Sequence, residues 1–248
     1  MLRIIARMDI KSPNLIKGVH LEGLKVIGDP CQRANKYFEQ GIDEILYMDI
    51  VASLYGRNHL TDLLEHTTKN VFVPITVGGG IRSLEDAKSI LRAGADKIAI
   101  NTAAFENPDL ITQLADTIGK QSVVVSIEAK RIDNMWEAFT DNGRGRTGWN
   151  VLDWIDNVQE KGCGEILITS VDQEGTRKGF DLELLSTVRQ STNVPVIVSG
   201  GFGSLEQIND EFPIHNGGLA IADAFHFDRY TVQAIKNDLA AKGYELRS

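Results

Sequence analysis

The sequence contains the same stretch twice, and this repeat limits the possible folds more than any other feature. Residues 73–85 read VPITVGGGIRSLE and residues 194–206 read VPVIVSGGFGSLE, with 8 of 13 positions identical at an offset of 121 residues. In each copy an apolar strand runs into glycines, and a serine then opens a helix with an acidic first turn. This order brings backbone N–H groups to an anion at a helix start. The duplication predicts two similar halves, each with one such glycine cradle.

A second repeat has the same offset and favours a barrel. Residues 41–49 read GIDEILYMD and residues 162–170 read GCGEILITS, with Gly, Glu, Ile and Leu in register. Short β-rich apolar runs alternate eight times with amphipathic helical patterns. Two repeats with equal spacing indicate a duplicated half of four units rather than an open doubly wound sheet. We therefore predict a single domain over residues 1–248, an α/β fold of the (β/α)8 TIM-barrel type built from two duplicated half-barrels.

The element boundaries follow from these patterns. Continuous apolar runs indicate strands that are covered on both faces, as in a parallel sheet. The two longest connections, 10–28 and 129–150, occupy equivalent places in the two halves, on the face where long loops build active sites. We place strands at 4–9, 44–49, 73–78, 97–101, 123–128, 165–170, 194–199 and 219–223, and helices at 29–40, 84–92, 108–117, 151–160, 182–189 and 231–241.

Composition argues against several classes of protein. The chain has 26 Lys and Arg against 34 Asp and Glu, a net charge of −8, and no basic run, so we expect no nucleic-acid partner. Its N-terminus carries charges among apolar residues, unlike a signal peptide, and no apolar run reaches about 18 residues, so we expect a cytoplasmic protein without a membrane span. Cys31 and Cys163 are isolated and the five histidines show no ligand spacing, so we expect no disulfide, metal or cofactor.

Acidic and polar side chains cluster where the predicted strands end. Asp9 and Glu128 end the first and fifth strands, which face each other across a barrel of eight. A small substrate between them could meet an acid and a base. The alternative is that these carboxylates cap loops or pair with neighbouring lysines. Asp49, at the end of the second strand, is the acid most easily explained as structural.

The two glycine cradles favour a phosphate-bearing substrate. Residues 78–80 form the first cradle and residues 200–201 the second, and glycines let a backbone approach an anion closely. Asn101 and Thr102 open the helix that follows the fourth strand. Tight turns alone would also need glycines, so one cradle is a weak signal. Two cradles at symmetric positions favour a substrate with one or two anionic ends.

Four charged residues share the opposite end of the predicted barrel. They lie at or near the first positions of strands one, two, four and six: Arg3, Glu44, Lys97 and Glu165. Residues on this face of a barrel ordinarily serve stability. Two cations and two anions in one ring are therefore most simply a salt-bridge network.

Over essentially its whole length the chain resembles the HisF family, the cyclase subunits of imidazole glycerol phosphate synthase. The resemblance rests on DIVAS at 49–53, TVGGGI at 76–81, GADKIAINTAA at 94–104, IEAKR at 127–131, GEILITSVDQEGT at 164–176 and VSGG at 198–201. It implies a barrel whose lower face docks a HisH-type glutaminase and which conducts ammonia to its upper face. The four charged residues match the gate of that channel position by position, so the resemblance implies a gate where the charges alone indicated a salt-bridge network.

The resemblance also assigns roles at the upper face. The family's two catalytic aspartates fall on Asp9 and on Glu128, which is one methylene longer. No cofactor is implied, and the substrate is a small molecule that carries phosphate or another anion. The implied substrate and phosphate contacts are Lys17, Asp49, Gly79, Gly80, Asn101, Thr102, Thr169, Asp172, Gly200, Gly201 and Asp223.

Two further residues depart from the family pattern near the substrate. Arg7 stands where the family has a small residue, and strand alternation points it into the lumen with Asp9 and Arg3. A guanidinium there would pair with Asp9 or Glu128, lower the pKa of that carboxylate and occupy the ammonia path. Asp223 stands where the family offers a serine to the second phosphate. A carboxylate about 4 Å from a phosphate charge costs roughly 1–4 kcal/mol.

These departures, combined with an intact charged ring, favour a changed ammonia acceptor. In ARMDIKSPNLIKGVHLEGL at 6–24 and MDIVASLYGRN at 48–58 the chain resembles the HisF-like branch associated with acetamidino modification of surface sugars, where a separate amidotransferase would be a third partner. Our leading expectation is therefore an ammonia-conducting subunit for a surface-polysaccharide precursor such as an O-antigen sugar. The first alternative is the ordinary cyclase of histidine biosynthesis, a lyase with Asp9 and Glu128 as acid and base. The second is a non-catalytic scaffold that activates the glutaminase without passing ammonia.

Overall fold

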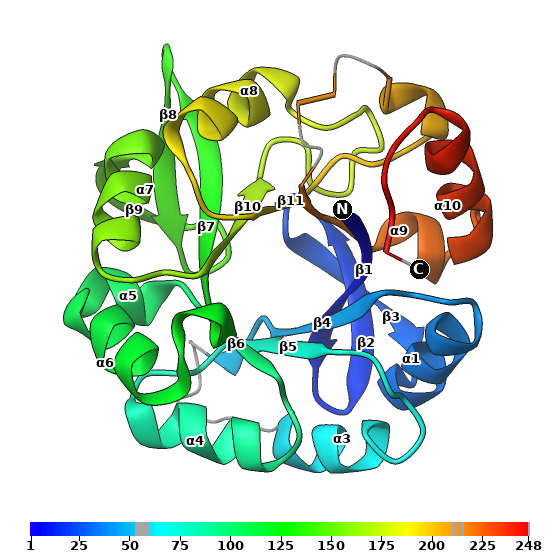
Figure 1. Cartoon of the computed structure of the whole chain (residues 1–248), viewed down its shortest axis with the longest axis horizontal. Helices are drawn as coiled ribbons and strands as arrows, with labels where there is room; N and C mark the ends of the chain where they lie inside the picture. The colour runs from blue at the N-terminus through cyan, green and yellow to red at the C-terminus, as the bar shows by residue number, and fades with distance from the viewer. Residues whose placement is uncertain (53–59, 210–211, 214–215, 248) are drawn as a thin grey trace.

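Eight parallel strands close into a barrel in the computed structural model, which describes residues 1–52, 60–209, 212–213 and 216–247 (Figure 1). The sheet closes because β12 pairs with β1 and β7 pairs with β10. The predicted TIM barrel is confirmed. In chain order the barrel strands are β1 (Leu2–Lys11), β4 (Glu44–Asp49), β5 (Ile75–Gly78), β6 (Lys97–Ile100), β7 (Val123–Ile132), β10 (Glu165–Ser170), β11 (Val196–Ser199) and β12 (Gly217–Ile221).

Amphipathic helices form a ring outside the strands, as the view along the barrel in Figure 1 shows. Their apolar faces pack on the sheet, and Trp154 is one of the largest side chains that they bury. Within the described ranges, no helix combines the length and apolar character that a membrane span needs. The helices are α1 (Pro30–Glu39), α3 (Leu60–Thr67), α4 (Leu84–Arg92), α5 (Thr102–Glu106), α6 (Asp109–Ile118), α7 (Val151–Glu160), α8 (Leu182–Ser191), α9 (Asp223–His226) and α10 (Val232–Ala241).

The two halves of the barrel repeat each other element by element. The strand pairs β1 and β7, β4 and β10, and β5 and β11 each begin and end at the offset of 121 residues found in the sequence. Each glycine cradle therefore follows an equivalent strand. The predicted duplication of two half-barrels is confirmed.

The connections after the first and fifth barrel strands are hairpins rather than long loops. β2 (Asn14–Val19) and β3 (Glu22–Gly28) follow β1, and β8 (Met135–Thr140) and β9 (Gly145–Asn150) follow β7. The expectation of loops was wrong because β1 and β7 both continue beyond the rim of the barrel. Their ends pair antiparallel with the next strand and fold the chain over the upper face.

Several strand boundaries also differ from the prediction. β5 and β11 begin two residues late because Pro74 and Pro195 have no N–H group to donate to a neighbouring strand. β12 ends at Ile221, and the chain then enters α9 at Asp223. Asp223 is therefore a first-turn residue of a short helix and not the end of a strand.

Side chains inside the barrel form three layers. Alternate residues of β1 face the lumen, so Arg3, Ile5 and Arg7 fall in successive layers. The lowest is the charged ring, by which we mean Arg3, Glu44, Lys97 and Glu165. The middle layer is apolar and contains Ile5, Leu46, Ala99, Val124, Leu167, Ile197 and Ala220. The upper layer is polar and buried, and contains Arg7, Ser126, Glu128, Thr169 and Ser199.

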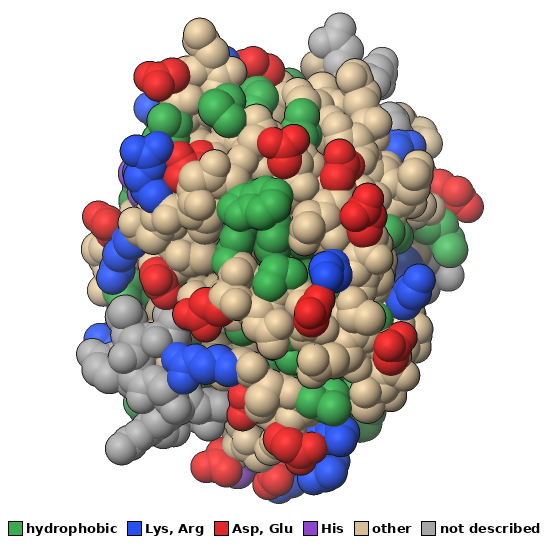
Figure 2. Space-filling view, turned by 90° about the vertical axis from the view of Figure 1, so that its left-hand side faces the viewer, with side chains coloured by type: hydrophobic (Ala, Val, Ile, Leu, Met, Phe, Trp, Pro, Cys, Tyr) green, Lys and Arg blue, Asp and Glu red, His purple; other side chains and the backbone are tan. Residues whose placement is uncertain are grey.

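The outer surface mixes charges of both signs. Figure 2 shows the side of the barrel near α5 and α7, where acidic and basic side chains are interspersed around a small group of apolar ones. Among the described residues drawn on this face, no single-sign stripe of the kind that binds nucleic acid is present.

Candidate functional site

The charged ring closes the lower end of the lumen through four ion pairs. Arg3 contacts Glu44 at 2.7 Å and also pairs with Glu165. Lys97 Nζ lies 3.2 Å from Glu44 and 2.9 Å from Glu165. Thr76 adds a hydrogen bond from its hydroxyl to Glu44 Oε1 at 2.5 Å. Both carboxylates are buried while both cations stay partly exposed, so the ring presents positive charge toward solvent.

Arg7 occupies the upper lumen and ties three strands together. Its Nε donates to Asp9 Oδ1 at 3.0 Å, and its Nη1 donates to the hydroxyls of Thr169 at 2.9 Å and Ser199 at 3.0 Å. Burial lowers the pKa of Arg7, but the surrounding carboxylates, Asp9 foremost, outweigh burial and raise it above its usual value. The guanidinium therefore stays charged although only 3% of the residue is exposed.

Asp9 stays ionised because of this partner. Burial raises the pKa of Asp9, but Arg7 and then Lys17 outweigh burial and hold the pKa below its usual range. A carboxylate with a low pKa that already accepts a hydrogen bond is a weak proton acceptor. The structure thus places Arg7 in the lumen and against Asp9, where it keeps one of the two predicted catalytic carboxyls ionised and hydrogen-bonded.

Glu128 has the opposite character. Burial raises the pKa of Glu128 to about 7, although the Gly143 backbone N–H donates to its Oε2 at 2.8 Å and works in the other direction. A carboxyl group with a pKa near neutrality can give or take a proton at physiological pH. The environments of Asp9 and Glu128 therefore push their pKa values apart, as in sites that use one carboxyl as acid and another as a fixed charge.

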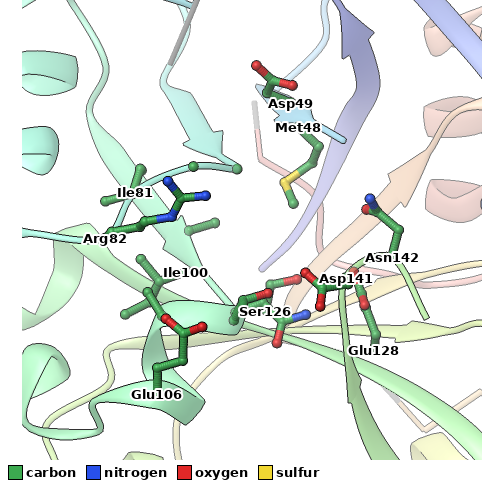
Figure 3. A pocket seen from close by; sticks show the side chains of 16 residues that line it. Met48, Asp49, Ile81, Arg82, Ile100, Glu106, Ser126, Glu128, Asp141 and Asn142 are labelled. Carbon is green, nitrogen blue, oxygen red and sulfur yellow. The ribbon is translucent and has the colours of Figure 1, made fainter. Parts of the chain in front are cut away.

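A cavity of about 240 Å³ opens beside the first cradle (Figure 3). Gly79, Gly80, Asn101 and Thr102 line it together with Glu128. The structure thus brings the predicted phosphate cradle and one predicted catalytic carboxyl to the same space. Its size and polar lining suit a small molecule with several hydrogen-bonding groups, and the glycine backbone at the cradle could approach an anionic group of it.

Local geometry explains the residues at this cradle. Gly79 has φ +96°, and a Cβ atom there would collide with the carbonyl oxygen of Asp49, so only glycine fits. Asn101 donates from its Nδ2 to the Phe139 carbonyl at 3.2 Å. Within the described residues, its Oδ1 is buried without a hydrogen-bond partner, so it remains an acceptor for a donor group of a bound molecule.

Other residues that line this cavity were missed in the sequence: Arg82, Glu106, Ser126, Asp141 and Asn142. Ser126 could have been found, because it stands two positions before Glu128 on the same face of β7. Asp141 and Asn142 lie in the turn between β8 and β9, both at positive φ. Since that hairpin was expected to be a loop, no local pattern pointed them toward the cavity.

The second cradle is nearly filled by protein. Its cavity measures only about 20 Å³ and is lined by Lys17, Glu174, Gly200, Gly201 and Asp223 among others. The buried Glu174 carboxylate pairs with Lys17, and Asp223 pairs with Arg229 at 3.0 Å. Glu174 was also missed in the sequence. Its partner lies 157 positions away, so no spacing indicated the contact.

Three other predicted contacts have partners within the protein. Asp49 lines the first cavity, and its Oδ1 accepts hydrogen bonds at 3.0 Å from two backbone N–H groups of the following turn. Thr169 is fully buried against Arg7. Asp172 accepts a hydrogen bond from the backbone N–H of Arg131 at 2.8 Å. Each of these contacts holds a loop or a side chain of the upper face in place.

Comparison with known proteins agrees with this architecture. A family model described as histidine biosynthesis protein matches residues 3–231. Three proteins named imidazole glycerol phosphate synthase subunit HisF are similar to the chain. One from Legionella pneumophila is 61% identical over 209 residues, covering 84% of this chain and 99% of the relative. One from Pyrococcus furiosus is 45% identical over 245 residues, covering 99% and 98%.

The third, from Natranaerobius thermophilus, is 42% identical over 248 residues and also covers nearly all of both chains, 99% and 98%. The family model spans both half-barrels, from residue 3 to residue 231. The chain therefore belongs to the histidine biosynthesis protein family, together with the relatives named imidazole glycerol phosphate synthase subunit HisF.

Proposed function

We propose that the chain is the barrel subunit of a glutamine-dependent enzyme of the imidazole glycerol phosphate synthase type. In such enzymes a HisH-type glutaminase releases ammonia, and the HisF barrel receives it. The observation that carries the proposal is the charged ring, whose four side chains contact one another at the lower end of the lumen. Its partly exposed cations face solvent at this end, where a docked glutaminase could contact the ring that closes the lumen.

The layer above the ring fits this role. It is apolar and includes two small side chains, Ala99 and Ala220. An unpaired charge is much more costly to bury than a neutral polar molecule. Neutral ammonia would therefore pass this layer more readily than ammonium, and the layer would keep water out of the upper lumen.

The names of the relatives favour the cyclase as the chemistry at the upper face. In that reaction ammonia and the bisphosphate intermediate of histidine biosynthesis yield imidazole glycerol phosphate and an aminoimidazole carboxamide ribotide. Glu128, with a pKa of about 7, would exchange protons with the substrate. Ionised Asp9 would stabilise positive charge on the reacting nitrogen.

A changed acceptor is the second candidate, and a specific observation favours it. Arg7 donates a hydrogen bond to Asp9, and the second cradle opens on a cavity of only about 20 Å³, which the Glu174 side chain helps to line. Both features hinder the binding of a bisphosphate between the cradles. An acetamidino-sugar precursor remains our expectation from the sequence for such an acceptor. The comparisons give that sugar branch, and the third amidotransferase it requires, no support.

Reconstitution separates the two candidates. The chain is combined with a HisH-type glutaminase and glutamine, and the histidine-pathway bisphosphate is added. Formation of imidazole glycerol phosphate at a rate comparable to that of a HisF cyclase would establish the first candidate and remove the second. Glutamine hydrolysis stimulated by the chain without that product would remove the first candidate, and would be the outcome for a changed acceptor and for the non-catalytic scaffold alike. Transfer of the labelled amide nitrogen of glutamine to an added sugar acceptor would then rule the scaffold out.

A further inference from the structure

A small apolar patch lies on the lower face of the barrel. Its centre is Phe72, which is 75% exposed, more than any other large apolar side chain among the described residues. Phe38 packs edge-on against it, with ring centroids 5.9 Å apart, and Val73 and Pro74 follow it in the chain, both half-buried. We call these four residues the Phe72 patch. Single exposed apolar side chains are common, whereas a cluster around an exposed aromatic ring is typical of a contact surface.

The connections of this patch place it at the same end of the barrel as the charged ring. Thr76, four residues after Phe72, donates a hydrogen bond to the ring carboxylate of Glu44. The chain from Phe72 to Thr76 therefore rises from below the ring into β5. Phe38 lies in the last turn of α1, and the helices of a barrel run opposite to its strands. Both aromatic rings thus lie at the end where the strands begin.

A recess lies on the other side of the ring, at the start of β10, β11 and β12, and β11 faces β5 across the barrel (Figure 1). It measures about 270 Å³, and its lining includes Arg3, Lys97, Gln121, Asn216 and Glu165. Two cations and two side-chain amides there meet one carboxylate, which pairs with both cations. This excess of positive charge and of N–H donors suits a carboxylate or carbonyl group of a partner.

The ring between the patch and the recess decides which partner fits this face. In a two-fold dimer, a second copy of the chain would bring the same face. The partly exposed Arg3 and Lys97 of one ring would then oppose those of the other, which is repulsive. A glutaminase that supplies ammonia has to meet the barrel at the ring. Its surface therefore extends over the patch on one side and over the recess on the other.

We propose that the glutaminase is held on both sides of the ring: an apolar pocket of the glutaminase receives Phe72, and one of its carboxylate or carbonyl groups enters the recess. Buried aromatic side chains often carry most of the binding energy of an interface. The inference rests on the proposed ammonia-receiving function, and it assigns affinity for the partner to Phe72, a residue outside the ring.

Titration of the glutaminase with the full chain tests the proposal. Complex formation with the HisH-type glutaminase of the same organism is followed by calorimetry, and glutamine hydrolysis by the release of glutamate. Because full burial of a phenylalanine side chain is lost, Phe72→Ala should raise the Kd by about tenfold or more, and Phe72→Asp by more than that. At saturating concentrations both variants should stimulate hydrolysis as fully as the wild type, since the ring is intact.

Two further variants keep the test decisive. Val26→Asp places the same new charge at a 59% exposed position of β3, over the upper face, and should leave the Kd unchanged. Gln121→Glu adds a carboxylate at the recess and should raise the Kd several-fold. An unchanged Kd in Phe72→Asp or in Gln121→Glu, or an equal loss in Val26→Asp, would overturn the proposal.

Light scattering of the chain alone addresses the other occupant of the face. We expect a monomer, and a dimer that Phe72→Asp separates would assign the patch to a second copy and overturn the proposal as well. Failure of the proposed function looks different, because the wild-type chain would then neither bind the glutaminase nor stimulate it. Failure of this inference alone leaves a wild-type complex that the Phe72 variants form equally well.

Discussion

Replacing Arg7 should show how strongly the upper lumen depends on one buried cation. Arg7→Met keeps an unbranched side chain but removes the donors to Asp9, Thr169 and Ser199. Removal of one member of a buried ion pair costs about 3–5 kcal/mol. In a chain of this size, that corresponds to a fall in Tm of roughly 6–20 °C. We expect a loss of this order at pH 8.

The dependence of this loss on pH follows from the pKa of Asp9. In the wild type the folded pKa is held below its usual value, so ionised Asp9 stabilises the fold above about pH 4 and loses this effect as the pH falls through the folded pKa. Without Arg7, burial raises the pKa of Asp9, and its charged form then destabilises the fold as the pH rises above about 4. The deficit of Arg7→Met should therefore be larger at pH 8 than at pH 5.

Urea unfolding followed by circular dichroism measures both effects. Asp9→Asn removes the charge that Arg7 balances, so the double variant should recover about 2 kcal/mol relative to additive behaviour. Lys88→Met, which removes an exposed pair with Glu85, should leave the midpoint nearly unchanged. Additivity of the two substitutions to within about 0.5 kcal/mol, or equal deficits at the two pH values, would refute this account of the lumen.

Three further predictions concern the remaining parts of the site. Burial raises the pKa of Glu128 to about 7, so the fold loses stability as the pH rises from the unfolded pKa to that value, and the loss stays complete at higher pH. Glu128→Gln should therefore stabilise the protein by roughly 3 kcal/mol at pH 8 and very little at pH 4. Urea midpoints at the two pH values check this, and a larger gain at pH 4 would contradict it. Lys97→Met leaves the two buried carboxylates of the ring with Arg3 as their one cation in the ring. In the complex with the glutaminase, this variant should release more ammonia to solution per glutamine hydrolysed than the wild type, and Lys88→Met serves as the control. If the release of ammonia to solution is unchanged, the charged ring does not act as a gate for ammonia. Gly79→Ala should lower the free energy of unfolding by about 1–3 kcal/mol and abolish the shifts that phosphate causes in the backbone amide NMR signals of the first cradle. Gly23→Ala, also at positive φ but in open space, should lower the stability and leave phosphate binding unchanged. Retained phosphate binding in Gly79→Ala would argue against the first cradle.

The barrel could be predicted because its signals are local and occur twice. The repeated strand, glycine and helix-start pattern places equivalent elements at a fixed offset, and burial on both faces makes the strands continuously apolar. The hairpins after β1 and β7 gave no comparable signal. Their strands are short and lie over the upper face, where β3 and β9 are largely exposed and lack an apolar run.

The site was predictable where the repeated glycine motif or the alternation of side chains along a strand decides the position of a residue. Arg3, Arg7 and Asp9 share one face of β1, so their common place in the lumen follows from the sequence. The pairing of Lys17 with Glu174 does not, because it joins a hairpin to a turn in the other half of the barrel. Likewise, the choice of Asp9 rather than Glu128 as the partner of Arg7 depends on the geometry of the closed barrel.

Binding to a glutaminase tests the central claim most directly. The chain is mixed with the HisH-type glutaminase of its own organism, and complex formation and glutamine hydrolysis are measured together. We predict a one-to-one complex in which hydrolysis is faster than in the free glutaminase, with the stimulation reduced by Lys97→Met. Separate elution of the two proteins, with hydrolysis unchanged by the chain, would contradict the proposal that this barrel receives ammonia through its charged ring.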